Sequence, residues 1–345
     1  KHTHQDGSCY VQNSGTLKCM GIYSGDGSVS DRHYHKAIDN NYNYQKLITG
    51  EMNKCGLTTE GKLRCWGYNN SFVFGNNTLD PNFYPSTQLQ GMTLIDFSMS
   101  NNIFSNINSC AIDSANKLYC WGDNVYGTVG LGYTGGYVKT PAQVDSGTLY
   151  KKISSTGFLV NCGITTNDDL KCWGYNAQGQ VGVGNTTNQT SPQIINSGVK
   201  YSKVVTSSDY TCGLRQSGDL FCWGYNTFGQ LGDGTTTHRT SPVAADSGVK
   251  YLDVAVGAYG MTCGVTIANK MKCWGKGVLG DGVTTLSSTA VDVDAMTDYK
   301  NVQAGIVGKY FCGVTTSDQL KCWGENKFSG KNPKNYNSYI YLPRQ

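Results

Sequence analysis

Charged residues are scarce in this chain of 345 residues: Asp, Glu, Lys and Arg together make up 15%, which is below the share in an average soluble protein. No dense run of Lys and Arg occurs, and a formal net charge of +4 over this length gives only weak attraction to polyanions. Long apolar runs are also missing, since no stretch approaches the roughly 18 to 20 residues that span a bilayer. We therefore expect neither a nucleic-acid partner nor membrane insertion.

An apolar leader is missing at the start of the sequence, which begins at Lys1. This start fits either a cytosolic protein or a mature form whose leader was removed. A hydrophobic content of 38% with 11% aromatic residues is enough to build a globular core. The arrangement of the cysteines distinguishes between these two cellular settings.

The 14 cysteines fall into seven pairs of identical spacing, and none is left over. The first cysteines of successive pairs are separated by 46, 55, 52, 50, 51 and 49 residues, a period typical of propeller blades and solenoids. The sequence therefore consists of seven units, one for each pair. The pairs are Cys9 and Cys19, Cys55 and Cys65, Cys110 and Cys120, Cys162 and Cys172, Cys212 and Cys222, Cys263 and Cys273, and Cys312 and Cys322.

Each pair lies in a segment with the pattern of a β-hairpin. In the second unit, alternation places Cys55, Leu57, Leu63 and Cys65 on one face, with the turn near Gly61. The two cysteines then lie opposite each other on antiparallel strands, where Cβ atoms are roughly 4.5 to 5.5 Å apart. Small adjustments bring such a pair into disulfide range, so we expect one disulfide in every unit.

Zinc binding and reduced buried thiols are the alternatives to disulfides. Structural zinc sites favour Cys-x-x-Cys pairs, and the sequence contains none. The even count and uniform spacing also disfavour free thiols. Oxidised pairs predict a secreted or extracellular protein, or a periplasmic or cell-surface one.

The units continue alike beyond the second cysteine. Residues 222–234 read Cys-Trp-Gly-Tyr-Asn-Thr-Phe-Gly-Gln-Leu-Gly-Asp-Gly, and a further strand precedes each first cysteine, so a unit offers about four strands. The Gly-rich runs are read as turns rather than as phosphate-binding loops, because they recur and no Gly-Lys-Ser/Thr follows. A tryptophan recurs at the same position in six of the seven units, which predicts packing between blades, with sugar stacking as the alternative: Trp66, Trp121, Trp173, Trp223, Trp274 and Trp323.

This repeat resembles that of the regulator of chromosome condensation superfamily, whose known members are seven-bladed propellers. The resemblance implies an all-β fold, a single seven-bladed β-propeller over 1–345 with about four antiparallel strands and one intra-blade disulfide per blade. Cysteine pairs place the approximate blades at 1–43, 44–93, 94–148, 149–199, 200–249, 250–297 and 298–345.

The first unit departs from the pattern, with Met20 where six others have Trp and only eight residues before Cys9. We therefore expect the C-terminal strand, Tyr339 to Leu342, to pair with the first blade and close the ring. The atypical blades 1 and 2 are the expected contact region for a partner.

Two sets of residues suggest ligands or modification. Histidines separated by one residue direct two imidazoles to one face of a strand and could bind a divalent metal, with an exposed polar strand as the alternative: His2, His4, His33 and His35. Four Asn-x-Ser/Thr triplets are candidate N-glycosylation sites, although a chain rich in Asn and Thr produces such triplets by chance: Asn69, Asn76, Asn185 and Asn188.

No catalytic set is recognisable. A nucleophile needs a nearby base, His238 is the only histidine outside the first unit, and the disulfides would consume every thiol. We expect no catalytic residue and no cofactor. The leading hypothesis is a non-enzymatic extracellular interaction or structural module whose rigid, Tyr- and Asn-rich propeller face binds a protein partner, including a second copy of itself. A carbohydrate-binding propeller is the alternative, and a hydrolase with its site in the axial channel is the third reading.

Overall fold

The computed structural model describes residues 9–12, 14–19, 24–27, 36–50, 52–100, 107–155, 159–305, 310–324 and 336–341. Regular structure in these ranges consists of the strands β1 to β27 and one 3-10 helix, η1 (Asn70–Phe72). Among the described helices, none has the length and hydropathy needed to cross a bilayer. The part of the chain that the structure describes is thus formed mainly of strands, as the short alternating segments predict.

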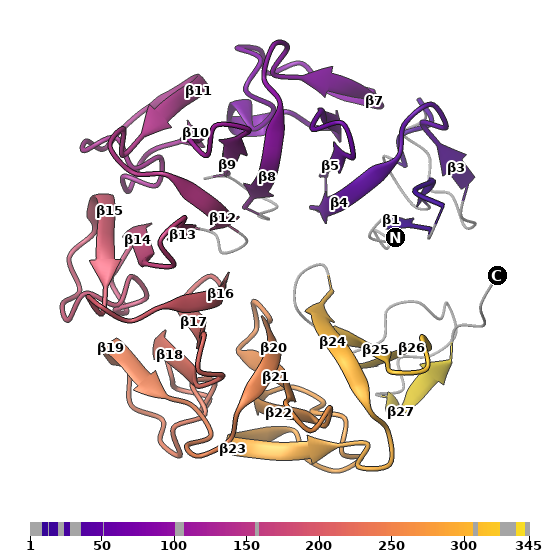
Figure 1. Cartoon of the computed structure of the whole chain (residues 1–345), viewed down its shortest axis with the longest axis vertical. Helices are drawn as coiled ribbons and strands as arrows, with labels where there is room; N and C mark the ends of the chain where they lie inside the picture. Colours follow the sequence, from indigo (N-terminus) through magenta and orange to yellow (C-terminus); the bar gives the residue numbers. More distant parts are fainter. Residues whose placement is uncertain are drawn as a thin grey trace, which may run out of the picture. The chain divides into compact units, whose positions relative to one another are not determined.

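Strands that follow one another in sequence pair into separate sheets, so each sheet has its own narrow colour range in Figure 1. The first sheet has three described strands, β1 (Cys9–Val11), β2 (Leu17–Cys19) and β3 (Lys36–Ile38). The second and third have four strands each: β4 (Tyr44–Thr49), β5 (Asn53–Thr58), β6 (Leu63–Gly67) and β7 (Asn82–Gln88), then β8 (Leu94–Met99), β9 (Asn108–Asp113), β10 (Leu118–Asp123) and β11 (Tyr137–Val144).

The remaining four sheets are also four-stranded. The fourth contains β12 (Tyr150–Ser154), β13 (Val160–Thr165), β14 (Leu170–Gly174) and β15 (Gln189–Ile195), and the fifth contains β16 (Tyr201–Thr206), β17 (Tyr210–Arg215), β18 (Leu220–Gly224) and β19 (Arg239–Ala244). The sixth contains β20 (Tyr251–Val256), β21 (Met261–Thr266), β22 (Met271–Lys276) and β23 (Leu286–Val293), and the seventh β24 (Tyr299–Ala304), β25 (Tyr310–Thr315), β26 (Leu320–Gly324) and β27 (Tyr336–Tyr341).

Contacts within the chain define two compact units, Lys1–Leu159 with Thr190–Pro192, and Val160–Gln189 with Gln193–Gln345. Inside each unit the apolar core lies between neighbouring sheets. In the first unit, Leu63 of β6 shares a buried cluster with Phe97 of β8 and Trp121 of β10. In the second, Leu214 of β17 shares one with Trp274 of β22. Within each unit, neighbouring sheets thus bury apolar side chains against each other.

The expected all-β architecture of four-stranded antiparallel sheets is confirmed for six sheets, whereas the first shows three strands among the residues described. The expected partner of the C-terminal strand was wrong. Instead of joining the first blade, β27 pairs with β26, with Cys322 opposite Ile340. In the fifth sheet, Val243 takes the position equivalent to Ile340, because it lies opposite the second cysteine of its unit, Cys222. The C-terminal segment forms the fourth strand of its own unit because the repeat supplies that strand after the Cys-Trp-Gly run.

The predicted hairpin register is confirmed in every unit, because each first cysteine lies directly opposite its second cysteine on the neighbouring strand. Seven disulfides join these pairs, with Cα atoms 4.1 Å apart in all of them. The bonds run from Cys9 to Cys19, from Cys55 to Cys65, from Cys110 to Cys120, from Cys162 to Cys172, from Cys212 to Cys222, from Cys263 to Cys273 and from Cys312 to Cys322. Every disulfide therefore lies within one sheet, and the 14 cysteines are all consumed.

A side chain cannot be accommodated at the glycine that follows each tryptophan, as Gly224 illustrates. Its φ is +107°, a left-handed conformation that side chains disfavour, and a Cβ there would lie 2.5 Å from the backbone oxygen of Asp209. The backbone nitrogen of Tyr225 donates to the same oxygen at 2.9 Å. This close approach fixes where the loop between β18 and β19 leaves the sheet.

Candidate functional site

The loops that follow the Cys-Trp-Gly strands are held by a buried asparagine. Asn226 accepts from the backbone nitrogen of Leu231 at 2.9 Å and donates to the carbonyl oxygens of Thr235 and Thr237 at 3.0 and 3.1 Å. The side chain therefore replaces a set of backbone hydrogen bonds that the loop cannot make with itself. Equivalent asparagines hold the loops of three other units: Asn69, Asn124 and Asn176.

No structural role was predicted for these asparagines, and only Asn69 was singled out from the sequence, as a candidate for N-glycosylation. The available signal was the recurrence of Asn four residues after the second cysteine. Since Asn226 and its equivalents are fully buried, the loops have a defined shape rather than a variable one. A defined loop can present side chains at fixed positions, which is what a binding surface requires.

Four side chains of the fifth and sixth sheets form a continuous group on these loops, which we call the loop patch: Tyr225, Phe228, His238 and Lys276. The rings of Tyr225 and His238 are 4.7 Å apart between centroids, and those of Tyr225 and Phe228 are 6.1 Å apart in an edge arrangement. The Lys276 Nζ lies 4.3 Å above the centre of the Phe228 ring. His238 and Lys276 are exposed, and the two other rings are half-buried.

A carboxylic acid lies beside the loop patch. Asp209, in the connection between β16 and β17, touches the patch through the backbone bond to Tyr225. Burial raises the pKa of the Asp209 carboxyl above its usual range. A second acid, Asp233, is close to Arg239, with 2.7 Å between Oδ2 and Nη2. Although burial opposes it, hydrogen bonds from Thr235 and Arg239 lower the pKa of Asp233.

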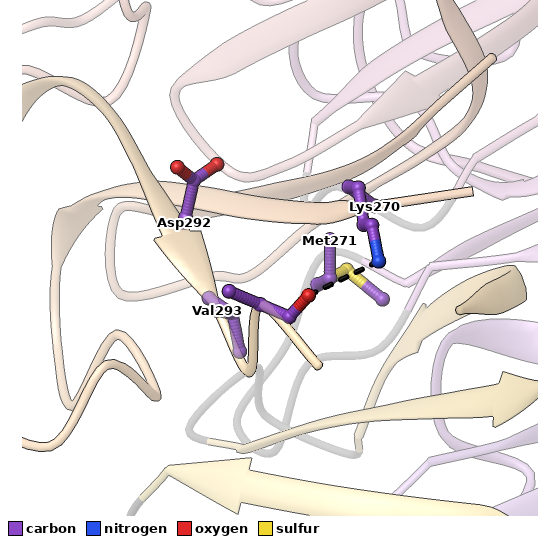
Figure 2. Close-up of a pocket in the computed structure, with 5 residues that line it drawn as sticks. Lys270, Met271, Asp292 and Val293 are labelled. Carbon is purple, nitrogen blue, oxygen red and sulfur yellow. Dashed lines mark hydrogen bonds between the residues drawn. The ribbon is translucent and has the colours of Figure 1, made fainter. Parts of the chain in front are cut away.

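Two hollows lie at the opposite, turn ends of the sixth and seventh sheets. The first, shown in Figure 2, has a volume of about 250 Å³ and is lined by Met271, Asp292 and Val293 together with Lys270 and Ala295. In Figure 2 the Lys270 side chain points to the Ala295 carbonyl oxygen, to which it donates at 3.0 Å. This ammonium is also 2.7 Å from Asp298.

The second hollow has a volume of about 280 Å³, and its lining includes Thr297, Thr315 and Lys321. Lys321 is buried and donates to Asp294 at 2.7 Å and to Thr297 at 2.6 Å. The charged groups of both hollows are thus bound to protein atoms already. Since Lys276 has no carboxylate partner among the described residues, the loop patch is the better candidate for a ligand.

The tryptophans of the repeat are buried between sheets, at 0% exposure for five of them and 3% for Trp323. Three donate from Nε1 at 2.9 Å to a carbonyl oxygen in the loop of the preceding unit: Trp121 to Val73, Trp223 to Gln180 and Trp274 to Gln230. These rings have no face open to a sugar.

The residues predicted to carry glycans or to bind a metal differ in whether the structure describes them and in how exposed they are. Asn69 is fully buried and its Nδ2 donates to Asn76 and Thr78, so this nitrogen is inaccessible to a glycan in the folded chain. Asn76 and Asn185 are exposed and Asn188 is half-buried, and glycosylation there stays a prediction. The histidines His2, His4, His33 and His35 lie outside the described residues. Within the described ranges, no three His, Cys, Asp or Glu side chains are grouped to hold a metal ion.

Comparisons with known proteins agree with the repeat. The model of the regulator of chromosome condensation (RCC1) repeat matches residues 170–214 and 217–263. The ultraviolet-B receptor UVR8 of Arabidopsis thaliana is 26% identical over 155 residues, which cover 43% of this chain and 33% of the receptor. This chain therefore matches about a third of the length of that relative.

Two solved structures show the same fold at low identity. Human WBSCR16 is 17% identical with a TM-score of 0.81, covering 97% of this chain and 93% of that one. Prp20p of Saccharomyces cerevisiae, in a study of its binding to Gsp1p and histones, is 15% identical with a TM-score of 0.77 and covers 97% of this chain and 88% of its own. The sheets described above are accordingly the blades of an all-β propeller.

Proposed function

This chain belongs to the regulator of chromosome condensation repeat superfamily, and on that premise we propose that it is a non-enzymatic module whose rigid propeller presents its loop face to a protein partner. We propose seven blades in the complete ring, one for each disulfide. The observation that carries the proposal is the loop patch, in which Tyr225, Phe228 and His238 stand on a loop fixed by Asn226. Aromatic side chains in fixed positions give large contact area at low entropic cost.

The proposed setting is outside the reducing cytosol, in a secreted or cell-surface protein. Seven disulfides that consume every cysteine support it, because such pairs persist only where thiols are not kept reduced. The relative Prp20p, whose binding to Gsp1p and histones has been studied, supports a protein as the class of ligand. A second copy of this chain is one such partner.

A photo-crosslinker tests the proposal directly. Thr227, exposed between Tyr225 and Phe228, is replaced by benzoyl-phenylalanine, and the protein is irradiated in the fluid or at the cell surface where it occurs. The matched control carries the crosslinker at Ser217, which is exposed at the opposite end of the same sheet. We expect a discrete protein adduct, identified by mass spectrometry, from position 227 and not from 217. Absence of any protein adduct from 227 contradicts the proposal.

A further inference from the structure

Two residues of the loop patch replace the residues that other units carry at the same positions. Lys276 follows the glycine of its unit, where the fourth and fifth units have Tyr175 and Tyr225. His238 takes the place of Asn188, since each accepts a hydrogen bond from the backbone nitrogen of the loop asparagine, Asn226 or Asn176. The fold therefore requires neither the lysine nor the histidine at its position.

His238 has a defined proton arrangement. Its Nδ1 accepts from the Asn226 backbone nitrogen at 3.0 Å, so the neutral ring carries its proton on Nε2. The side chain is exposed, and Nε2 is the ring nitrogen that the loop does not use. In the fourth unit the amide oxygen of Asn188 serves the same loop nitrogen at 2.9 Å without an imidazole. The histidine thus adds an outward hydrogen-bond donor to the patch.

Lys276 adds a cation at the other end of the patch. Its ammonium lies above the Phe228 ring, and among the described residues it forms no ion pair. An exposed cation over an aromatic face is stabilised only modestly, by about 0.5 to 1 kcal/mol. It therefore remains able to attract a carboxylate.

The acids around the patch do not neutralise it. Asp233 is bound by Arg239 and Thr235. Asp281, in the loop of the sixth unit, accepts from the backbone nitrogens of Val283 and Thr284. Asp209 is half-buried beside Tyr225, where burial disfavours its charged form.

We propose that the loop patch binds an acidic segment of the partner protein, with carboxylates against Lys276 and His238 Nε2 and an aromatic side chain against Phe228 and Tyr225. This inference rests on the proposed function and adds the chemistry of the partner. The order along the patch, cation, two rings and donor, is complementary to a peptide that alternates acidic and aromatic residues. Charge attraction provides encounter and orientation, and ring contact provides the desolvated area.

Fluorescence polarisation with a defined probe tests this chemistry. The probe is a fluorescein-labelled octapeptide, Glu-Glu-Phe-Glu-Glu-Phe-Glu-Glu, and the comparison peptide has Gln in place of each Glu. We expect the full chain to bind the acidic peptide at low salt at least about ten-fold more tightly than the Gln peptide, and to lose that preference as salt rises. Equal binding of the two peptides, or tighter binding of an oligothymidine of equal charge, overturns the inference.

Two variants that restore the repeat residues locate the site. Lys276→Tyr and His238→Asn keep the loop hydrogen bonds that Tyr225 and Asn188 illustrate, so both should fold and melt like the wild type. Each variant should lower the affinity for the acidic peptide by about three- to ten-fold. The control Lys200→Gln, which removes an exposed lysine paired with Asp169, should leave this affinity unchanged. Unchanged binding by both variants overturns the inference.

The crosslinking experiment separates this inference from the proposed function. If Lys276→Tyr and His238→Asn leave the protein adduct at position 227 intact and the peptide affinity unchanged, the module still binds a protein but not through acidic chemistry. If position 227 gives no adduct in the wild type either, the proposed function itself is wrong.

Discussion

Arg64 and Asp39 form a bidentate ion pair that joins two successive sheets: Nε lies 2.5 Å from Oδ2 and Nη2 lies 2.9 Å from Oδ1. Tyr44 donates its hydroxyl to the same carboxylate. Asp39 lies in the connection that leaves β3, and Arg64 is on β6. The pair is nearly buried, with 11% and 8% of the two side chains exposed. It therefore fastens the end of one sheet to the middle of the next.

The same joint recurs with other cations. Asp294 accepts from Tyr299 and from Lys321, and Asp246 accepts from Tyr251 with Lys272 at 4.0 Å. Between the second and third sheets, Leu89 and Leu94 take the places of the acid and the tyrosine, and Tyr119 takes the place of the cation; the three side chains belong to or pack against one apolar cluster. The contact between successive sheets at these three positions can thus be polar or apolar, provided that the three side chains are compatible with one another.

Removal of the guanidinium alone should be costly. Arg64→Ala leaves the Asp39 carboxylate buried without its cation, and we expect the free energy of unfolding to fall by about 3 to 5 kcal/mol, measured by guanidinium chloride titration. The matched variant Asp39→Leu with Tyr44→Leu and Arg64→Tyr copies the joint of the third sheet. We expect the free energy of unfolding of this triple variant to fall by less than half as much. An equal fall in both variants would show that the unpaired Asp39 carboxylate does not cause the loss of stability.

One disulfide can be removed without leaving a free thiol. The double variant Cys212→Ala and Cys222→Ala should lower the free energy of unfolding by about 2 to 3 kcal/mol, because the closed loop restricts the unfolded chain. Equilibrium unfolding measures the loss. Peptide mapping of the non-reduced variant should still find the other six bonds as assigned, and bridges between different units would contradict the hairpin register.

The carboxyl of Asp209 predicts a dependence of stability on pH. Because burial raises its pKa, the folded state binds this proton more tightly than the unfolded state, and stability falls as pH rises from the usual Asp value through the folded pKa. Asp209→Asn should raise Tm at neutral pH by roughly one to three degrees and have little effect near about pH 2.5, where both states are protonated.

Asp233 provides the control with the opposite sign. Its lowered pKa contributes stability above the unfolded pKa, and that contribution is lost as pH falls through the folded pKa. Asp233→Asn should therefore lower Tm at neutral pH and converge with the wild type in acid. Thermal melts of both variants across the acid range would refute this account if they shifted in the same direction.

Gly182 allows a test of the packing at the tryptophans. A Cβ there would lie 2.5 Å from Nε1 of Trp223, and φ is +88°. Gly182→Ala should cost about 2 kcal/mol or more of stability, since both the backbone and the ring must move. Gly147 has no atom within 4 Å of an added Cβ and no positive φ, so Gly147→Ala should be neutral within about 0.5 kcal/mol.

The glycosylation triplets should differ in use. In a host that N-glycosylates secreted proteins, Asn185→Gln should remove one glycan mass because Asn185 is exposed in its loop. Asn69→Gln should leave the glycan mass unchanged and lower Tm, since the buried side chain holds the loop of its unit. Intact-mass spectrometry before and after glycan release measures both, and a glycan at Asn69 would contradict the buried position.

The hairpin register was predictable because it depends only on local alternation: a separation of ten residues places Cys55 opposite Cys65 whatever surrounds them. The pairing of β27 with β26 was missed, although it follows the repeat, in which a fourth strand comes after the Cys-Trp-Gly run, as β19 does after β18. The loop patch was missed for a different reason. Tyr225 and Lys276 are 51 residues apart in sequence, and only the packing of one unit's loop on the next brings Phe228 between them.

The disulfides also determine how the chain behaves under tension. Each closes a loop between residues ten apart, and none joins one sheet to another. When the molecule is pulled from its two ends, the sheets can separate without any covalent bond breaking. The residues inside the seven disulfide-closed loops cannot extend, so the oxidised chain is shorter than the fully extended reduced chain by only roughly a fifth. Apart from the backbone that connects successive sheets, no covalent bond holds one sheet to another, and a force measurement should extend the oxidised chain sheet by sheet.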